Sequence, residues 1–376
     1  MKKLIIGVNH SYPDSTGGSE KVVLQISEGL VSNFGYECTI LSNSIKQEKR
    51  INGVDIKRCS TVYSDFISQL DSLHPDHLFV YGDLFHQWGF VLQNNKLPLS
   101  KSIALVGMNG MIANKFLFDK FKKNKDSFSV ITHSDNYQDF QECSKNSINV
   151  NVIPNGINLK EFDIQNNFRQ KYNIVDKNII LCVSNFFPGK GQEFLIPIFE
   201  KLQNKRKDFI AVFISSNSSW NIVEARRRSI MNKVNSSKFN SLFLNNIPRE
   251  DVISAFLSAD VFVFPSQKEV APLVILESMA SRTPWISLPV GNVEKLKGGI
   301  IINSNKKELD GSLSYDDNIY QLFCDEIDKL LSDDKLKCAL SYNGRKQIEE
   351  EYDFREIIKL YDKVFSESMA KFNLSK

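Results

Sequence analysis

The sequence predicts an α/β protein of two domains, each built on a doubly wound parallel sheet. The chain has 376 residues, more than one hydrophobic core usually spans. Short β-branched runs alternate with helix-length stretches in two successive series, a pattern typical of such sheets. The turn sequence Pro154-Asn-Gly-Ile-Asn158 separates the two series. We therefore predict a first domain over residues 1–157, a second over 158–353 and a final helical segment over 354–376.

The first series predicts seven strands and one glycine-rich loop. The loop carries Gly17 and Gly18 directly before a helix that opens at Ser19-Glu20. These glycines would let the backbone approach a ligand at the helix start, although a plain turn fits the residues nearly as well. In doubly wound sheets, ligands bind beyond the carboxyl ends of the strands. The expected strands are 4–8, 38–41, 54–58, 77–81, 103–106, 129–132 and 150–153, and the ends facing a ligand are 81–83, 108–110 and 133–134.

The second series begins with a strand that runs directly into a loop containing a lysine. Lys190 stands between two glycines in the loop Ser184 to Gly191, so it is flexible enough to reach a diphosphate. The alternative is a solvated loop lysine. Pro197 falls inside the following helix and predicts a kink there. The expected strands of this series are 179–183, 210–215, 242–245, 261–264, 285–288 and 300–302.

A strand, a loop and a helix start follow one another within residues 261–277. The apolar strand 261–264 ends at Pro265-Ser266, and Pro272 suits the first position of the next helix. Unpaired backbone N–H groups should surround that helix start, which attracts anions. The candidate phosphate-binding residues are Ala271, Pro272, Leu273 and Val274.

Two glutamates flank this expected anion site. Glu269 lies in the loop, and Glu277 lies about a turn and a half into the helix, with its side chain leaning back toward the same cavity. Carboxylates repel phosphate but accept hydrogen bonds from vicinal hydroxyl groups. A phosphate on the amides and hydroxyls on the acids indicate a nucleotide sugar. The alternative is a solvated loop acid and a surface helix residue.

Composition narrows the classes of function. The net charge of +3 gives no indication of nucleic-acid binding. No segment approaches twenty apolar residues and no signal-peptide cleavage site follows the first residues, so we expect a cytoplasmic protein. The six cysteines are scattered, as reduced and mostly buried thiols would be. The five histidines lack metal-ligand spacing and no D-x-D motif follows a strand, so we expect no metal.

Over nearly its whole length, and most strongly in residues 179–291, the chain resembles the retaining glycosyltransferases of family 4, known as glycosyl transferases group 1. The resemblance rests on Pro265-Ser266, Glu269, Pro272-Leu273, Glu277-Ser-Met-Ala280, Pro284 and Val290-Gly291. It implies the GT-B fold, with two Rossmann-like domains facing each other across a cleft and the last helix crossing back to the first domain. It also implies a nucleoside-diphosphate sugar as co-substrate without a further cofactor, a glycan or lipid-linked acceptor, and transfer with retention.

The resemblance also assigns roles to individual residues, and two of them depart from the family pattern. Glu269 matches the glutamate that touches the donor sugar, and Lys190 matches a lysine that neutralises the leaving diphosphate beside Ser184 and Asn185. Asn185 stands where arginine is usual, and Asn109 stands where the family has a histidine near the sugar. These departures favour, as an alternative, a catalytically weak nucleotide-sugar-binding subunit of a partner transferase. His133 or His10 could approach the same space as the missing histidine.

One basic segment suggests contact with a membrane surface. Residues 115–125 carry five lysines against Asp119, a net +4, which exceeds the charge of the whole chain. Phe118 and Phe121 share one helical face, so the segment can be an amphipathic helix on an anionic membrane, reaching a lipid-linked acceptor. The alternative, equally weighted, is a solvated helix whose phenylalanines belong to the core of the first domain.

Overall fold

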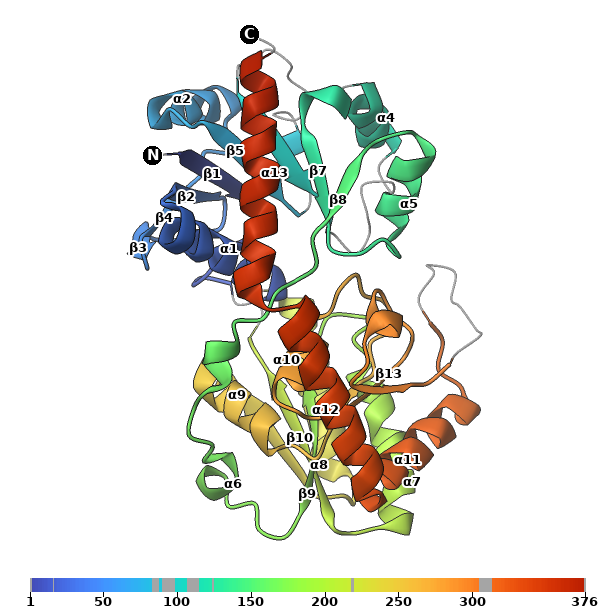
Figure 1. Cartoon of the computed structure of the whole chain (residues 1–376). Helices are drawn as coiled ribbons and strands as arrows, with labels where there is room; N and C mark the ends of the chain where they lie inside the picture. Colours follow the sequence, from blue (N-terminus) through green and yellow to red (C-terminus); the bar gives the residue numbers. More distant parts are fainter. Residues whose placement is uncertain are drawn as a thin grey trace. The chain divides into compact units, whose positions relative to one another are not determined.

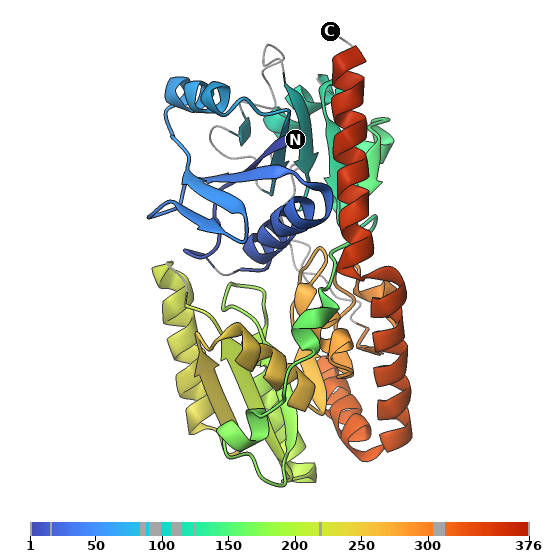
Figure 2. The same cartoon turned by 60° about the vertical axis from the view of Figure 1, so that its left-hand side comes forward.

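The computed structural model describes residues 2–15, 17–82, 88–89, 99–106, 115–123, 125–217, 220–303 and 313–374. It divides into two compact units. The first unit comprises Met1–Gly156 and Phe354–Lys376, and the second comprises Ile157–Asp353. The division falls inside the turn sequence predicted as the linker. Figures 1 and 2 show a twisted sheet with helices packed around it in each unit.

The first unit contains an eight-stranded sheet in the order β3-β4-β2-β1-β5-β6-β7-β8. Its pairs are parallel except for β3, which runs antiparallel to β4 at the edge. The strands are β1 (Lys3–Val8), β2 (Glu37–Ser42), β3 (Lys49–Ile51), β4 (Val54–Arg58), β5 (His77–Tyr81), β6 (Ser100–Ala104), β7 (Ser129–Thr132) and β8 (Val150–Val152).

Two strands of this sheet differ from the sequence prediction. Strand β3 was not predicted, because its residues Lys-Arg-Ile are mostly exposed and show no apolar run. Strand β6 was placed at 103–106, but it begins at Ser100. Its first residues are polar yet buried, since Ser100 and Ser102 each share a 2.8 Å hydrogen bond with a ring nitrogen of His77 on β5. The start of this strand has no apolar run, so the sequence pattern does not predict it.

Helix α13 (Phe354–Leu374), at the end of the chain, belongs to the first unit. It packs on α1 (Gly18–Phe34) and β6, and Figure 2 shows it running along the sheet. Its buried residues Ile358, Tyr361 and Phe365 lie at helical spacing within the segment 354–376 that was predicted to be helical. The other helices described in this unit are α2 (Tyr63–Leu73), α4 (Lys115–Lys123), η1 (Lys125–Ser127) and α5 (Gln138–Lys145).

The second unit contains a six-stranded, fully parallel sheet in the order β11-β10-β9-β12-β13-β14. The order reverses between β9 and β12, and such a reversal opens a crevice beyond the carboxyl ends of the two strands. The loops that follow these strands, 184–191 and 265–272, are the two that the sequence singled out. The strands are β9 (Asn178–Val183), β10 (Phe209–Ser215), β11 (Ser241–Asn245), β12 (Val261–Phe264), β13 (Trp285–Ser287) and β14 (Gly299–Ile301).

The helices of the second unit correct one prediction. Pro197 was expected to kink a helix, but α7 starts at Leu195, so the proline sits in the first turn. A backbone N–H group in the first turn of a helix has no partner within the helix. Proline lacks this group, so Pro197 removes no hydrogen bond from α7. The helices are η2 (Leu159–Phe162), α6 (Phe168–Lys171), η3 (Gln192–Phe194), α7 (Leu195–Lys205), α8 (Asn221–Ser236), α9 (Arg249–Ser258), α10 (Leu273–Ala280), η4 (Val293–Lys295), α11 (Asp317–Ser332) and α12 (Asp334–Glu351).

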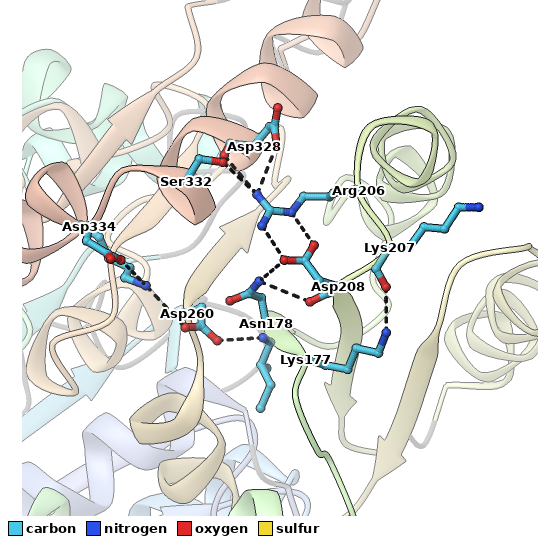
Figure 3. Close-up of polar contacts among 11 residues, drawn as sticks. Lys177, Asn178, Arg206, Lys207, Asp208, Asp260, Asp328, Ser332 and Asp334 are labelled. Carbon is cyan, nitrogen blue, oxygen red and sulfur yellow. Dashed lines mark hydrogen bonds and ion pairs between the residues drawn. The ribbon is translucent and has the colours of Figure 1, made fainter.

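A polar cluster ties the amino ends of the strands in the second unit to α11 (Figure 3). The guanidinium of Arg206 donates to Asp208, 2.7 Å away, and to Asp328 and Ser332 on α11. Asn178, at the start of β9, donates to the carboxylate of Asp208. These charges satisfy one another at the end of the sheet opposite the ligand crevice, so we assign them to the fold.

Candidate functional site

The loops after β9 and β12 are held against each other by backbone contacts. Gly191 adopts a φ of +77°, and a Cβ there would overlap the carbonyl oxygen of Pro265. The backbone N–H of Gln267 donates to the carbonyl oxygen of Gly189 at 2.8 Å. Only glycine fits the position of Gly191 without strain, since both its conformation and its surroundings exclude a side chain. These contacts fix the segment that carries Lys190 beside the segment that carries Glu269.

Lys190 and Glu269 form an ion pair. The distance from Nζ of Lys190 to Oε1 of Glu269 is 2.6 Å, and the hydroxyl of Ser266 donates to the same oxygen at 2.6 Å. The two side chains are 16% and 9% exposed, so neither is a solvated loop residue. The structure brings together two residues that lie 79 positions apart in the sequence.

Helix α10 begins beside this pair. Pro272 has an extended ψ of 115° and is the N-cap residue of the helix. We predicted Pro272 as the first helical residue, so the helix begins one position later than expected, at Leu273. Leu273 and Val274 open the helix, and the side chain of Pro272 makes no capping hydrogen bond to their backbone N–H groups. The loop before the helix is fixed from the other side, because the N–H of Asn292 donates to the carbonyl oxygen of Val270. A helix therefore begins where we predicted the anion site, and anion binding there stays a prediction.

Glu277 lies on α10 with its side chain only 5% exposed, so the alternative of a surface residue is wrong. Its Oε1 is 2.7 Å from Nη2 of Arg249, the first residue of α9. Arg249 also donates through Nε and Nη2 to Oε2 of Glu161, at 3.1 and 3.0 Å. Burial by itself would lower the pKa of Arg249, but Glu277 and Glu161 outweigh it and raise that pKa.

Arg249 and Glu161 were not found from the sequence. Neither lies in a motif, and they are 88 positions apart. The signal that could have indicated them is indirect: a buried carboxylate at Glu277 requires a cation nearby.

Ser184 and Asn185 lie at the carboxyl end of β9, as predicted. The N–H of Ser184 donates to the carbonyl oxygen of Ile214, and its hydroxyl donates to the carbonyl oxygen of Asn185. The same carbonyl accepts from Nε2 of Gln192 at 2.6 Å, a buried residue that sequence reasoning missed. The side-chain oxygen of Asn185 is buried and has no partner among the described residues. Asn185 thus places a hydrogen-bond acceptor where a cation was expected.

The glycine-rich loop of the first unit already holds a carboxylate. Gly17 caps α1 and Gly18 is its first residue. A Cβ on Gly17 would overlap the carboxylate of Glu20, and the hydroxyl of Ser15 donates to that carboxylate at 2.9 Å. An acidic side chain near a helix N-terminus is stabilised by the helix dipole. The space beside Gly17 is therefore occupied by the side chain of Glu20.

Of the two histidines suggested as substitutes at Asn109, His133 is already engaged by other residues of the first unit. Asn109 itself lies outside the described residues. Nε2 of His133 bonds the hydroxyl of Tyr81 at 2.7 Å and Nδ1 bonds the carbonyl oxygen of Ile153 at 2.8 Å, so both ring nitrogens are engaged. Burial lowers the pKa of His133 to about 4. His10 is exposed.

The apolar face of the basic helix belongs to the core, not to a membrane surface. Phe118 and Phe121 of α4 are buried in the hydrophobic core of the first unit, where Phe121 packs on Phe128 with ring centroids 4.8 Å apart. Lys122 pairs with Asp119 at 3.0 Å. The alternative in which Phe118 and Phe121 serve the fold is therefore the one that the structure supports.

Among the residues that the structure describes, no group of three histidine, cysteine, aspartate or glutamate side chains could hold a metal ion. No helix in the described part of the chain is long and apolar enough to cross a membrane. The cysteines are free thiols, and Cys338 alone among the six is exposed.

The chain is similar to known glycosyltransferases. Residues 164–347 match the family model Glycosyl transferases group 1. A Bacillus subtilis (strain 168) protein named as a glycosyltransferase, YtcC, is 25% identical over 73% of this chain and 69% of its own. The capsular polysaccharide biosynthesis glycosyltransferase CapM of Staphylococcus aureus is 24% identical over 58% of this chain. The match spans only 55% of CapM.

Solved structures share the fold over both units. Sucrose-phosphate synthase of Thermosynechococcus elongatus superposes with a TM-score of 0.79 at 17% identity, covering 97% of this chain and all of the other. Anabaena HepE, in complex with UDP and glucose, gives a TM-score of 0.77 at 12% identity, covering 98% of this chain and all of HepE. These likenesses confirm the predicted GT-B fold with its two Rossmann-like domains.

Proposed function

We propose that this protein is a glycosyltransferase whose donor is a nucleoside-diphosphate sugar, because its residues 164–347 match the family model Glycosyl transferases group 1 and its fold is GT-B. The transferred group is a hexose-type sugar, and the acceptor is a glycan or a lipid-linked glycan. Transfer retains the configuration of the anomeric carbon and uses no metal. The enzyme works in the cytoplasm.

The observation that carries the proposal is the Lys190–Glu269 pair beside the uncapped start of α10. A lysine and free backbone N–H groups at one crevice favour a diphosphate. Glu269 in the loop and Glu277 on α10 supply charged acceptors for hydroxyl groups. A nucleotide sugar combines both kinds of group, with the diphosphate between a ribose and a hexose.

In this proposal the protein positions the reactants and stabilises charge. The acceptor oxygen bonds to the anomeric carbon while the bond from that carbon to the diphosphate oxygen breaks on the same face. The acceptor's proton passes to an oxygen of the departing diphosphate, so no protein base is needed. Lys190 and the N–H groups of α10 stabilise the negative charge that develops on the diphosphate.

The relatives indicate which donor and acceptor to test first. HepE was solved with UDP and glucose and with UDP-glucose, and a trehalose-6-phosphate synthase was solved with UDP-2-fluoro glucose. UDP-glucose is therefore the first donor for this chain. CapM is named for capsular polysaccharide biosynthesis, which supports a glycan acceptor.

A second candidate function rests on Asn185. Its buried side-chain oxygen is an acceptor at the carboxyl end of β9 and contributes no positive charge to a diphosphate. A site that binds the donor but stabilises the leaving group weakly would suit a nucleotide-sugar-binding subunit that supports a partner transferase.

The test begins with the purified chain and thermal-shift and calorimetric titrations of UDP-, GDP- and ADP-sugars. We expect one of these series to bind and raise the unfolding temperature. Release of the nucleoside diphosphate is then measured with and without glycan acceptors. Turnover supports the enzyme, and binding without turnover supports the second candidate. If none of the nucleotide sugars binds, the proposal is wrong.

A further inference from the structure

Glu277 is joined to the beginning of the second unit by one guanidinium group. Arg249 bonds Oε1 of Glu277 at 2.7 Å and bonds Oε2 of Glu161 with both Nε and Nη2. Glu161 lies in η2, whose start is capped by Asn158, because Oδ1 of Asn158 accepts from the N–H of Lys160. Three elements, η2, α9 and α10, thus meet at Arg249.

The charges at this junction are arranged around Glu277. A carboxylate that is 5% exposed loses most of its hydration and requires a cation to stay ionised. Arg249 supplies that cation although it is the first residue of α9, where the helix dipole disfavours positive charge. Its position is therefore stabilised by the two carboxylates and not by the helix.

We infer that Arg249 is a positioning residue for nucleotide binding: it holds the carboxylate of Glu277 ionised and aimed at the ribose hydroxyls, and Glu161 holds Arg249. The inference rests on the proposed function, since it deepens the role given there to Glu277. The planar guanidinium suits this task because its donors are fixed in direction, and a flexible lysine ammonium fixes a carboxylate less well.

The test separates positioning from a purely structural role by changing the ligand as well as the protein. Kd values are measured by calorimetry for UDP and for 2′,3′-dideoxy-UDP, or for the matching pair of whichever nucleotide binds the wild-type chain. The wild type should lose about tenfold or more when the ribose hydroxyls are removed. Arg249→Gln should bind UDP about tenfold or more weakly and should bind the two ligands almost equally.

Two further variants grade the effect. Arg249→Lys keeps the charge and should recover part of the discrimination between the ligands. Glu161→Gln leaves Arg249 in place with one charged partner fewer, so its discrimination should fall between those of the wild type and Arg249→Gln. If Arg249→Gln does not fold, these two variants carry the test, with unfolding temperatures measured for each.

Arg169→Gln is the matched control. Arg169 is another half-buried arginine of the second unit, 39% exposed against 36% for Arg249, and it pairs with Asp260 at the opposite end of the sheet. It should retain the full discrimination. Arg249 or Glu161 variants that still discriminate like the wild type would overturn the inference. A wild-type chain that binds no nucleotide contradicts the proposed function itself, which is a different result.

Discussion

Nζ of Lys190 lies 2.6 Å from Oε1 of Glu269, so the side chain proposed to bind the diphosphate and the side chain proposed to bind the sugar neutralise each other. Ser266 donates to the same carboxylate oxygen and holds it in this arrangement. A diphosphate that binds at α10 must compete with Glu269 for Lys190. Donor binding therefore replaces one ion pair by another, and the net gain is smaller than a free lysine would give.

Replacing Glu269 with glutamine should strengthen binding of the free nucleoside diphosphate. The neutral amide no longer competes for Lys190, and we expect a gain of about 1 kcal/mol, or roughly fivefold in Kd. Turnover should fall, because the carboxylate that accepts from the donor sugar is lost. Calorimetry and a product-release assay measure the two effects. Glu294→Gln, a change at an exposed residue of the same unit, is the control. Equal affinity of Glu269→Gln and wild type would show that the pair does not oppose binding.

Replacing Lys190 with alanine should weaken binding of the diphosphate more than binding of the free nucleoside. The lysine would contact only the phosphate groups, so we expect a loss of about 1.5–3 kcal/mol for the diphosphate and little for the nucleoside. Both affinities are measured by calorimetry. Lys177→Ala, which removes a lysine bonded to the carbonyl oxygen of Lys207 at the other end of the sheet, should change neither. Equal losses for the two ligands would mean that Lys190 does not bind phosphate.

Gly191 should be far less tolerant of alanine than Gly189. Both have positive φ, +77° and +84°, which costs an alanine about 1–2 kcal/mol. A Cβ at Gly189 meets nothing within 4 Å, whereas at Gly191 it overlaps the carbonyl oxygen of Pro265. Gly191→Ala should therefore lose nucleotide binding and at least about 2 kcal/mol of stability, since the backbone must shift. Urea unfolding and calorimetry compare the variants, and matching results for the two glycines would refute the close approach.

The sequence could predict those contacts of the site that depend on where strands end, but not those that depend on how helices pack. Lys190 and Glu269 could be placed together because each follows an apolar strand, and the ends of neighbouring parallel strands meet. Arg249 could not be placed, because its contact with Glu277 depends on how α9 and α10 pack. The same limit applies to the fold: β12 is a continuous apolar run, whereas β6 is buried through hydrogen bonds to His77, which no pattern of single residues reveals.

Stability of the first unit should fall as the pH drops from about 6.5 to 4. Burial lowers the pKa of His133 to about 4, so in this range the unfolded chain binds a proton that the folded chain does not. The loss should be on the order of 2–3 kcal/mol from this residue. His77, with a pKa lowered to about 3, adds to it and extends it to lower pH. His133→Gln should give a flatter profile by urea unfolding and circular dichroism. An unchanged slope would show that His133 titrates normally in the fold.

Any membrane attachment through α4 should be electrostatic, because Phe118 and Phe121 are committed to the core of the first unit. The lysines of residues 115–125 can each contribute about 1 kcal/mol near an anionic leaflet, which gives weak and salt-sensitive binding. We expect the wild type to sediment with anionic liposomes at low salt, and to be released at about 0.5 M salt, where the Debye length falls below the reach of surface charges.

The variant with Lys120, Lys122 and Lys123 replaced by glutamate should remain in the supernatant. Phe118→Ala is the complementary control: it should lower the unfolding free energy by about 3 kcal/mol, as a large core truncation does, without weakening liposome binding of the folded chain. Binding that survives high salt would require an apolar anchor and contradict the burial of the two phenylalanines. If the wild type stays in the supernatant at low salt, the acceptor is better sought among water-soluble glycans, because the basic helix then has no part in reaching a lipid.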